Sequence, residues 1–156
     1  FVSKAARLIK VVTPKEREQL VEKISDKVTG VKANRWATCM LRSGNQHRAK
    51  CAEDGIPQRR NASPEFCLGC MHADISEMNF KGIIISIKDD VMACRNDNLP
   101  QFIKEPHAKI LKLALARVKE LRKNSGKTVF DKYIDYLEES FSMAEVSCLT
   151  GSRQND

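Results

Sequence analysis

The sequence predicts a mainly α protein, a helical domain with an irregular knuckle and little or no β structure. Apolar residues recur at three- and four-residue spacing in three segments after Asp74, which is the period of amphipathic helices. The segment 31–74 has no such period and is rich in Gly, Pro, Asn and Arg. Four of the six cysteines lie in that same segment, so something other than apolar burial must order it.

Length and charge narrow the class of protein. A chain of 156 residues suits one compact domain, and its start at Phe1 is typical of a fragment of a longer protein. The most apolar run, residues 82–87, is far too short to cross a bilayer, so we expect no membrane partner. The cysteine pattern suits metal better than disulfides, which predicts a reducing, cytoplasmic compartment. The net charge of +7 favours a polyanionic partner such as DNA.

An N-terminal helical segment is expected over residues 1–30. Thr13 can cap a helix, Pro14 suits its first position and Glu16 can complete a capping box. The helix should run to about residue 29, with Gly30 as its stop. Its apolar face would be formed by Leu20, Val21, Ile24 and Val28.

The knuckle, residues 31–74, is followed by a helical bundle over 75–146 and a flexible tail over 147–156. Within the knuckle, residues 35–42 alternate enough to form one short strand. Helices are expected over about 76–95, with Met78 on the apolar face, over 106–123, closed by Gly126, and over 129–144, with Val129 on the apolar face. A strand at 83–87 competes locally with the first helix because these residues are largely β-branched.

The cysteine spacing predicts one structural Zn²⁺ ion. A Cys-x-x-Cys pair, such as the one at Cys67 and Cys70, places two thiolates on one tetrahedral ion. Cys39 and Cys51 would have to be brought to this pair by the fold. His47 and His72 remain rival ligands, and a metal-free set of buried or reactive thiols is the other alternative; the expected ligands are Cys39, Cys51, Cys67 and Cys70.

Four thiolates close the coordination sphere, and a closed site has no place for an activated water. The competing interpretation is a zinc nucleobase deaminase, because Cys51-Ala-Glu53 followed by a Cys-x-x-Cys pair resembles its signature, with Glu53 as the proton shuttle. Phe66 stands where that signature has proline directly before the pair.

Basic residues crowd the cysteine segment. They can face phosphates, or they can be the neighbours that a site with two net negative charges attracts. Both interpretations stay open at this point. The DNA-binding candidates are Arg35, Arg42, Arg48, Lys50, Arg59 and Arg60.

Three stretches carry a resemblance to a known family. They are Asn34-Arg-Trp-Ala-Thr-Cys39, Lys50-Cys-Ala-Glu-Asp-Gly-Ile-Pro57 and Ala62-Ser-Pro-Glu-Phe-Cys-Leu-Gly-Cys70. Their order resembles the C-terminal zinc-binding extension of phage-type tyrosine-recombinase integrases of bacterial mobile elements. Ala37 stands where that family has Gly.

The resemblance implies a part in DNA integration or recombination, with cleavage performed by a catalytic domain before Phe1. No position matches the family's arginine and His-x-x-Arg elements, so no catalytic residue is carried over and the fragment is expected not to be an enzyme. The implied partners are DNA and other recombinase subunits. An unrelated zinc-containing DNA-binding or scaffolding domain is the first alternative.

Overall fold

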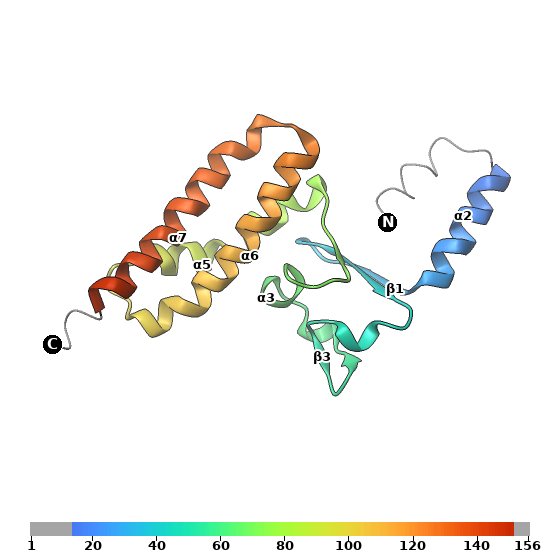
Figure 1. Cartoon of the computed structure of the whole chain (residues 1–156), viewed down its shortest axis with the longest axis horizontal. Helices are drawn as coiled ribbons and strands as arrows, with labels where there is room; N and C mark the ends of the chain where they lie inside the picture. The colour runs from blue at the N-terminus through green and yellow to red at the C-terminus, as the bar shows by residue number, and fades with distance from the viewer. Residues whose placement is uncertain (1–13, 152–156) are drawn as a thin grey trace. The chain divides into compact units, whose positions relative to one another are not determined.

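A computed structural model describes residues 14–151, apart from the side chains of residues 17, 20, 24, 25 and 146–151. The chain divides into two compact units, Phe1–Asp74 (unit 1) and Ile75–Asp156 (unit 2), where the sequence analysis expected one compact domain. Helices account for most of the described residues, which confirms the mainly α class (Figure 1).

Unit 1 begins with a helix and continues into a sheet. Helix α2 spans Pro14–Lys27, and the chain then forms strand β1, Val28–Ala33, instead of remaining helical to residue 29. Gly30 is therefore a strand residue and not the stop of the helix. The expected cap, Thr13, lies outside the described residues, and Val21, placed on the apolar face, is exposed.

The main sheet of unit 1 is antiparallel and has the order β1-β2-β5. Strand β2, Thr38–Arg42, lies within the strand expected at 35–42, whereas β1 and β5, Ala73–Asp74, were not expected. Strand β1 forms because of its pairing and not because of burial. Its residues are largely exposed, and its backbone is held by the ladder to β2, in which Gly30 lies opposite Leu41.

A second, two-stranded sheet forms a tight hairpin. Strands β3, Ala52–Glu53, and β4, Ile56–Pro57, are joined by Asp54 and Gly55, which both have positive φ angles of 50° and 77°. An Asp-Gly pair is the common solution for such a two-residue turn. The single-turn helix α3, Pro64–Cys67, follows, with short 3-10 turns at Gln46–Arg48 and Arg59–Asn61.

Unit 2 is helical throughout its described part. A 3-10 turn, Glu77–Asn79, leads into α4, Phe80–Ser86, and α5, Lys88–Arg95, so the helix expected at 76–95 is interrupted at Ile87. The competing strand at 83–87 does not form. Helix α6 spans Gln101–Ser125 and ends at Gly126, which has a positive φ of 69°, as expected for a C-terminal glycine.

Helix α6 begins five residues before its expected start, with Pro106 inside it. Pro106 is the sixth residue of α6, beyond the first turn, so the helix lacks one backbone hydrogen bond at this point. After a 3-10 turn, Thr128–Phe130, helix α7 spans Asp131–Gly151 and thus continues into the segment expected to be a flexible tail. Figure 1 shows α6 and α7 as an antiparallel pair beside α5.

Apolar side chains from all these helices form the core of unit 2. Phe80 meets Phe130 edge to face with ring centroids 4.7 Å apart. Two residues assigned to apolar faces are instead exposed, Met78 at 92 % and Val129 at 52 %, because both lie in 3-10 turns and not in the helices that follow. The buried apolar residues are Phe80, Ile83, Ile87, Val91, Cys94, Leu111, Ala114, Val118, Leu121, Phe130, Leu137 and Ala144.

Candidate metal centre

Four cysteines of unit 1 border one small cavity. The cavity has a volume of about 20 Å³, and its lining includes the cysteines expected to act as ligands, Cys39, Cys51, Cys67 and Cys70. A water molecule needs roughly 10–15 Å³ of such space, so the cavity suits a single small occupant. These residues are up to 31 positions apart in the sequence, and the fold gathers them.

Cys39 and Cys51 are positioned by two different local structures. Cys39 lies in β2 and pairs with Ala73 of β5. This pairing brings Cys39 next to the segment that directly follows Cys70. Cys51 directly precedes the β3–β4 hairpin, and its carbonyl accepts a hydrogen bond from the Gln58 backbone N–H at 3.2 Å. The hairpin thereby orders the segment that carries Cys51.

The Cys-x-x-Cys pair is positioned by a helix turn. Pro64 begins α3, and the Cys67 backbone N–H donates to the Ser63 carbonyl at 2.8 Å. Cys70 then donates its N–H to the Cys67 carbonyl at 3.2 Å, which closes a tight turn. This turn keeps both thiols on one side of the backbone, at the spacing that suits a shared tetrahedral ion.

The electrostatics also indicate that the four thiols lie close together. Burial raises the pKa of the Cys39 thiol above its ordinary value, the Arg59 guanidinium opposes this rise, and the other three cysteines add to it. Burial likewise raises the pKa of Cys67, opposed by the Trp36 indole N–H and a backbone hydrogen bond at Ser63. Without a metal, Cys39 and Cys67 therefore favour the neutral thiol form.

Buried donors without acceptors surround this thiol cluster. In the described part of unit 1, every buried side-chain polar atom that lacks a hydrogen-bond partner carries hydrogen. Asn34 and Arg59 line the cavity, and Trp36 lies close enough to Cys67 to affect its pKa. The unsatisfied atoms are Asn34 Nδ2, Arg59 Nε, Arg59 Nη2 and Ser63 Oγ, whereas the Trp36 indole N–H has no partner of ordinary geometry but acts on the pKa of Cys67 as a hydrogen-bond donor does.

Unsatisfied buried donors are costly and rare, at roughly 1–3 kcal/mol each. Thiol sulfur is a poor acceptor, whereas a thiolate carries the negative charge that such donors need. Donors gathered around four thiols are therefore the surroundings that a Zn²⁺-thiolate centre requires. The described residues contain no group of three or more His, Cys, Asp or Glu side chains already set around one point to hold a metal.

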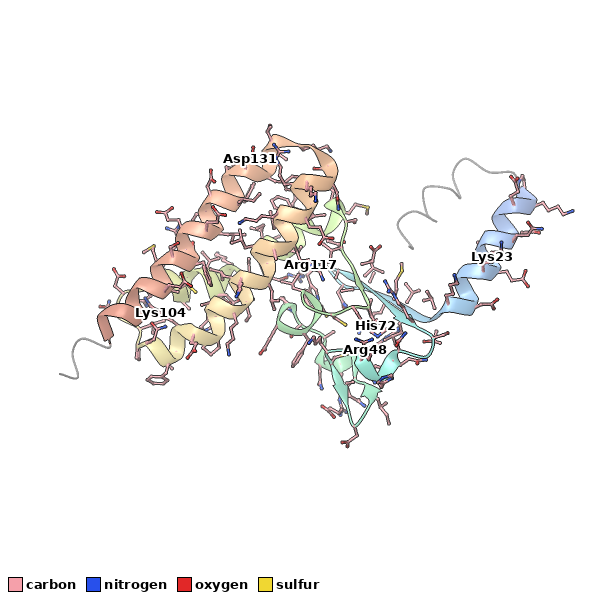
Figure 2. All side chains as sticks on the ribbon, in the orientation of Figure 1. Lys23, Arg48, His72, Lys104, Arg117 and Asp131 are labelled. Atoms are coloured by element: carbon pink, nitrogen blue, oxygen red, sulfur yellow. The ribbon has the colours of Figure 1, made fainter. Side chains whose placement is uncertain are left out.

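The rival histidine ligands are placed elsewhere. His72 is 1 % exposed and lies in the interior of unit 1 (Figure 2). Its Nδ1 accepts from the Arg42 backbone N–H at 3.2 Å, and its Nε2 donates to the Asn45 carbonyl at 2.9 Å. Both ring nitrogens of His72 are thus used to fasten the backbone. His47 is exposed and does not line the cavity.

Glu53, the proposed proton shuttle of the deaminase alternative, also lies away from the thiols. Its side chain is 57 % exposed, does not line the cavity, and accepts a hydrogen bond from Asn61 Nδ2 at 2.7 Å. The geometry therefore disfavours deamination at this site.

The six DNA-binding candidates fall into two groups. Five are exposed, and Arg60 among them lies 3.9 Å from Glu53. Lys50 and Arg59 both line the thiol cavity, but Arg59 is the one candidate that is half-buried, with its Nε and Nη2 atoms inaccessible to solvent. The exposed candidates are Arg35, Arg42, Arg48, Lys50 and Arg60.

Sequence reasoning missed the interior roles of Asn34 and Arg59. Their neighbours Arg35 and Arg60 are exposed, and nothing local distinguishes Arg59 from Arg60. The Asp54-Gly55 turn, by contrast, carried a recognisable hairpin signal that could have been read.

Comparison of the chain with protein-family models, curated proteins and solved structures finds no match in any of the three. In the part of the chain that the structure describes, no helix has both the length and the apolar character needed to cross a membrane.

Proposed function

We propose that unit 1 binds one structural Zn²⁺ ion through Cys39, Cys51, Cys67 and Cys70. The observation that carries the proposal is that these four thiols border one ion-sized cavity whose buried donors lack acceptors. When bound, the ion would replace the thiol protons and supply the folding free energy that this apolar-poor unit lacks. A site of four thiolates stabilises structure and leaves no position for a reacting water.

We further propose that the chain is a zinc-stabilised accessory domain of an integrase-like tyrosine recombinase, which contributes DNA binding or subunit assembly during DNA integration. The support is the three-part resemblance that ends at Cys70, together with the exposed cations around the thiol cluster. Thiolate ligands need a reducing compartment, which agrees with a cytoplasmic protein.

Metal content is the first test. Elemental analysis and X-ray absorption at the zinc edge on the full chain should find one zinc with four sulfur neighbours. Three sulfurs with one oxygen or nitrogen would reject the closed site, and a folded unit 1 without metal would reject the zinc proposal altogether.

DNA binding is tested by its dependence on salt. Arg42→Ala combined with Arg48→Ala should weaken DNA binding and reduce the salt slope by about two, since each lost phosphate contact lowers it by about one. Lys15→Ala with Lys23→Ala is the matched control, because it removes the same charge from exposed positions of α2. Equal effects of the two pairs would leave only general electrostatic attraction, and no binding at any salt would favour a scaffolding domain.

A further inference from the structure

Arg59 lies against a gap that Gly30 leaves in strand β1. A Cβ atom built on Gly30 would lie 2.5 Å from Arg59 Nη2 and 3.3 Å from Arg59 Cζ. No real Cβ tolerates the shorter distance, so the guanidinium can occupy this position only because residue 30 has no side chain. Gly30 has no positive φ angle, so the backbone alone does not require glycine there.

The residue that fills this gap also borders the thiol cavity. Arg59 lines the cavity together with all four thiols, and its Nε and Nη2 are buried without a partner. No carboxylate lines the cavity to offset the buried positive charge. The sulfurs are therefore the groups beside this charge that can become anionic.

Charge balance explains the position of Arg59 beside the thiols. A divalent ion with four thiolates carries two net negative charges, and burying them unpaired is costly. Lys32 and Lys50 also line the cavity but are exposed, so the buried guanidinium is the cation least screened by water. It offsets one of the two negative charges, and its fixed planar donors suit bonds to sulfur lone pairs. The opposing effect of Arg59 on the pKa of Cys39 is consistent with such proximity.

We propose that Arg59, seated in the gap left by Gly30, donates hydrogen bonds to the cysteine sulfurs of the metal centre and thereby sets its affinity for metal. Arg59 is thus a positioning and charge-compensating residue and not a DNA contact. The inference rests on the proposed zinc site. It separates Arg59 from Arg60, its exposed neighbour.

The test compares two ways of removing the same interaction from the full chain. Arg59→Gln removes the charge, whereas Gly30→Ala leaves Arg59 in the sequence but displaces the end of its flexible side chain. Each should weaken zinc binding by about 10–100-fold in chelator competition, as loss of a neighbour to a ligand does. The double variant should be no weaker than Arg59→Gln alone, because both changes remove one interaction.

A spectroscopic readout separates hydrogen bonding from simple loss of packing. In the Co²⁺-substituted chain, the thiolate-to-metal band should move to lower energy in Arg59→Gln and in Gly30→Ala, because thiolate lone pairs lose their donors. Arg59→Lys keeps the charge without the planar donors, so its band should shift while its affinity falls less. Arg60→Gln is the matched control and should leave both affinity and band unchanged.

The outcomes distinguish this inference from the zinc proposal. Wild-type protein without metal would remove both. Wild-type protein with four sulfur neighbours, combined with unchanged affinity and band in Arg59→Gln, would overturn the role of Arg59 alone. Additive losses in the double variant would also overturn it, because Gly30 and Arg59 would then act separately. If Arg59→Gln does not fold, Gly30→Ala with its intact Arg59 decides the question.

Discussion

The two units use different means to offset the entropy of ordering a chain. Unit 2 buries two phenylalanines and a set of branched aliphatic side chains contributed by α4, α5, α6 and α7. Among the described side chains of unit 1, Leu68 is the one large aliphatic residue that is buried, and Ala37, Ala49, Cys70 and His72 make up the rest. Apolar burial contributes about 25 cal/mol per Å², so unit 1 gains far less from it.

The difference shows which unit would gain most from the proposed zinc ion. Fixing one residue's backbone costs about 1–2 kcal/mol, and a core as small as that of unit 1 does not offset this cost over 31–74. Backbone ladders and the His72 hydrogen bonds define its shape but add little net free energy each. A structural metal is the usual supplement for such small units. Metal removal should therefore destabilise unit 1 and spare unit 2, and truncation of the apolar core should do the reverse.

Metal removal should have the largest effect. Adding a strong chelator to the full chain, or introducing Cys67→Ser, should unfold the thiol-bearing part of unit 1, because a structural zinc site supplies about 10 kcal/mol or more of folding free energy. Hydrogen exchange should show lost protection in β2 and β5 and unchanged protection in α6. Cys94→Ser is the control, since Cys94 is buried in unit 2. Retained protection in β2 would contradict the proposal that unit 1 is stabilised by zinc.

A core truncation in unit 2 should produce the reverse pattern. Phe130→Ala should lower the free energy of unfolding of unit 2 by about 3–5 kcal/mol, because Phe130 is 1 % exposed and packs on Phe80. Urea denaturation followed by circular dichroism measures this loss, and the Co²⁺ absorption of unit 1 should not change. Val129→Ala, at the exposed neighbouring position, should cost less than about 0.5 kcal/mol.

The polar link between α5 and α7 should matter to a smaller degree. Arg95 Nε donates to Ser140 Oγ at 2.7 Å, and its guanidinium lies 4.2 Å from the ring centroid of Tyr136. Ser140 is fully buried, so Arg95→Ala should cost about 1–3 kcal/mol in urea denaturation. Lys119→Ala, which breaks an exposed ion pair with Glu138, should cost less than about 1 kcal/mol. Equal losses of stability in Arg95→Ala and Lys119→Ala would show that the buried hydrogen bond to Ser140 contributes no more than an exposed ion pair.

The smallest effect is expected at Met78. Sequence periodicity placed it on an apolar face, yet it is 92 % exposed. Met78→Ser should therefore change the stability of unit 2 by no more than about 0.5 kcal/mol, whereas Ile83→Ala, at a fully buried position, should cost about 2–5 kcal/mol. A large loss at Met78 would show that its side chain is covered in solution.

Local sequence patterns were sufficient to predict much of this fold. The three- and four-residue apolar period predicted the helical character of unit 2. Gly126 was recognisable as a helix end because few other residues adopt its positive φ. The boundaries were less accurate, since Pro106 lies inside α6 and the helix expected at 76–95 is interrupted at Ile87.

By itself, the sequence determined the mainly α class, the helices of unit 2 and the four cysteines as a candidate ligand set, because each of these follows from local spacing or residue chemistry. Only the tertiary structure decided that β1 pairs with β2, that both nitrogens of His72 bind backbone, and that Arg59 is half-buried while Arg60 remains exposed. The physical reason is that these outcomes depend on partners distant in the sequence. Arg59 can occupy its position beside the thiols only because Gly30 has no side chain. No local sequence pattern indicates that these two residues are neighbours.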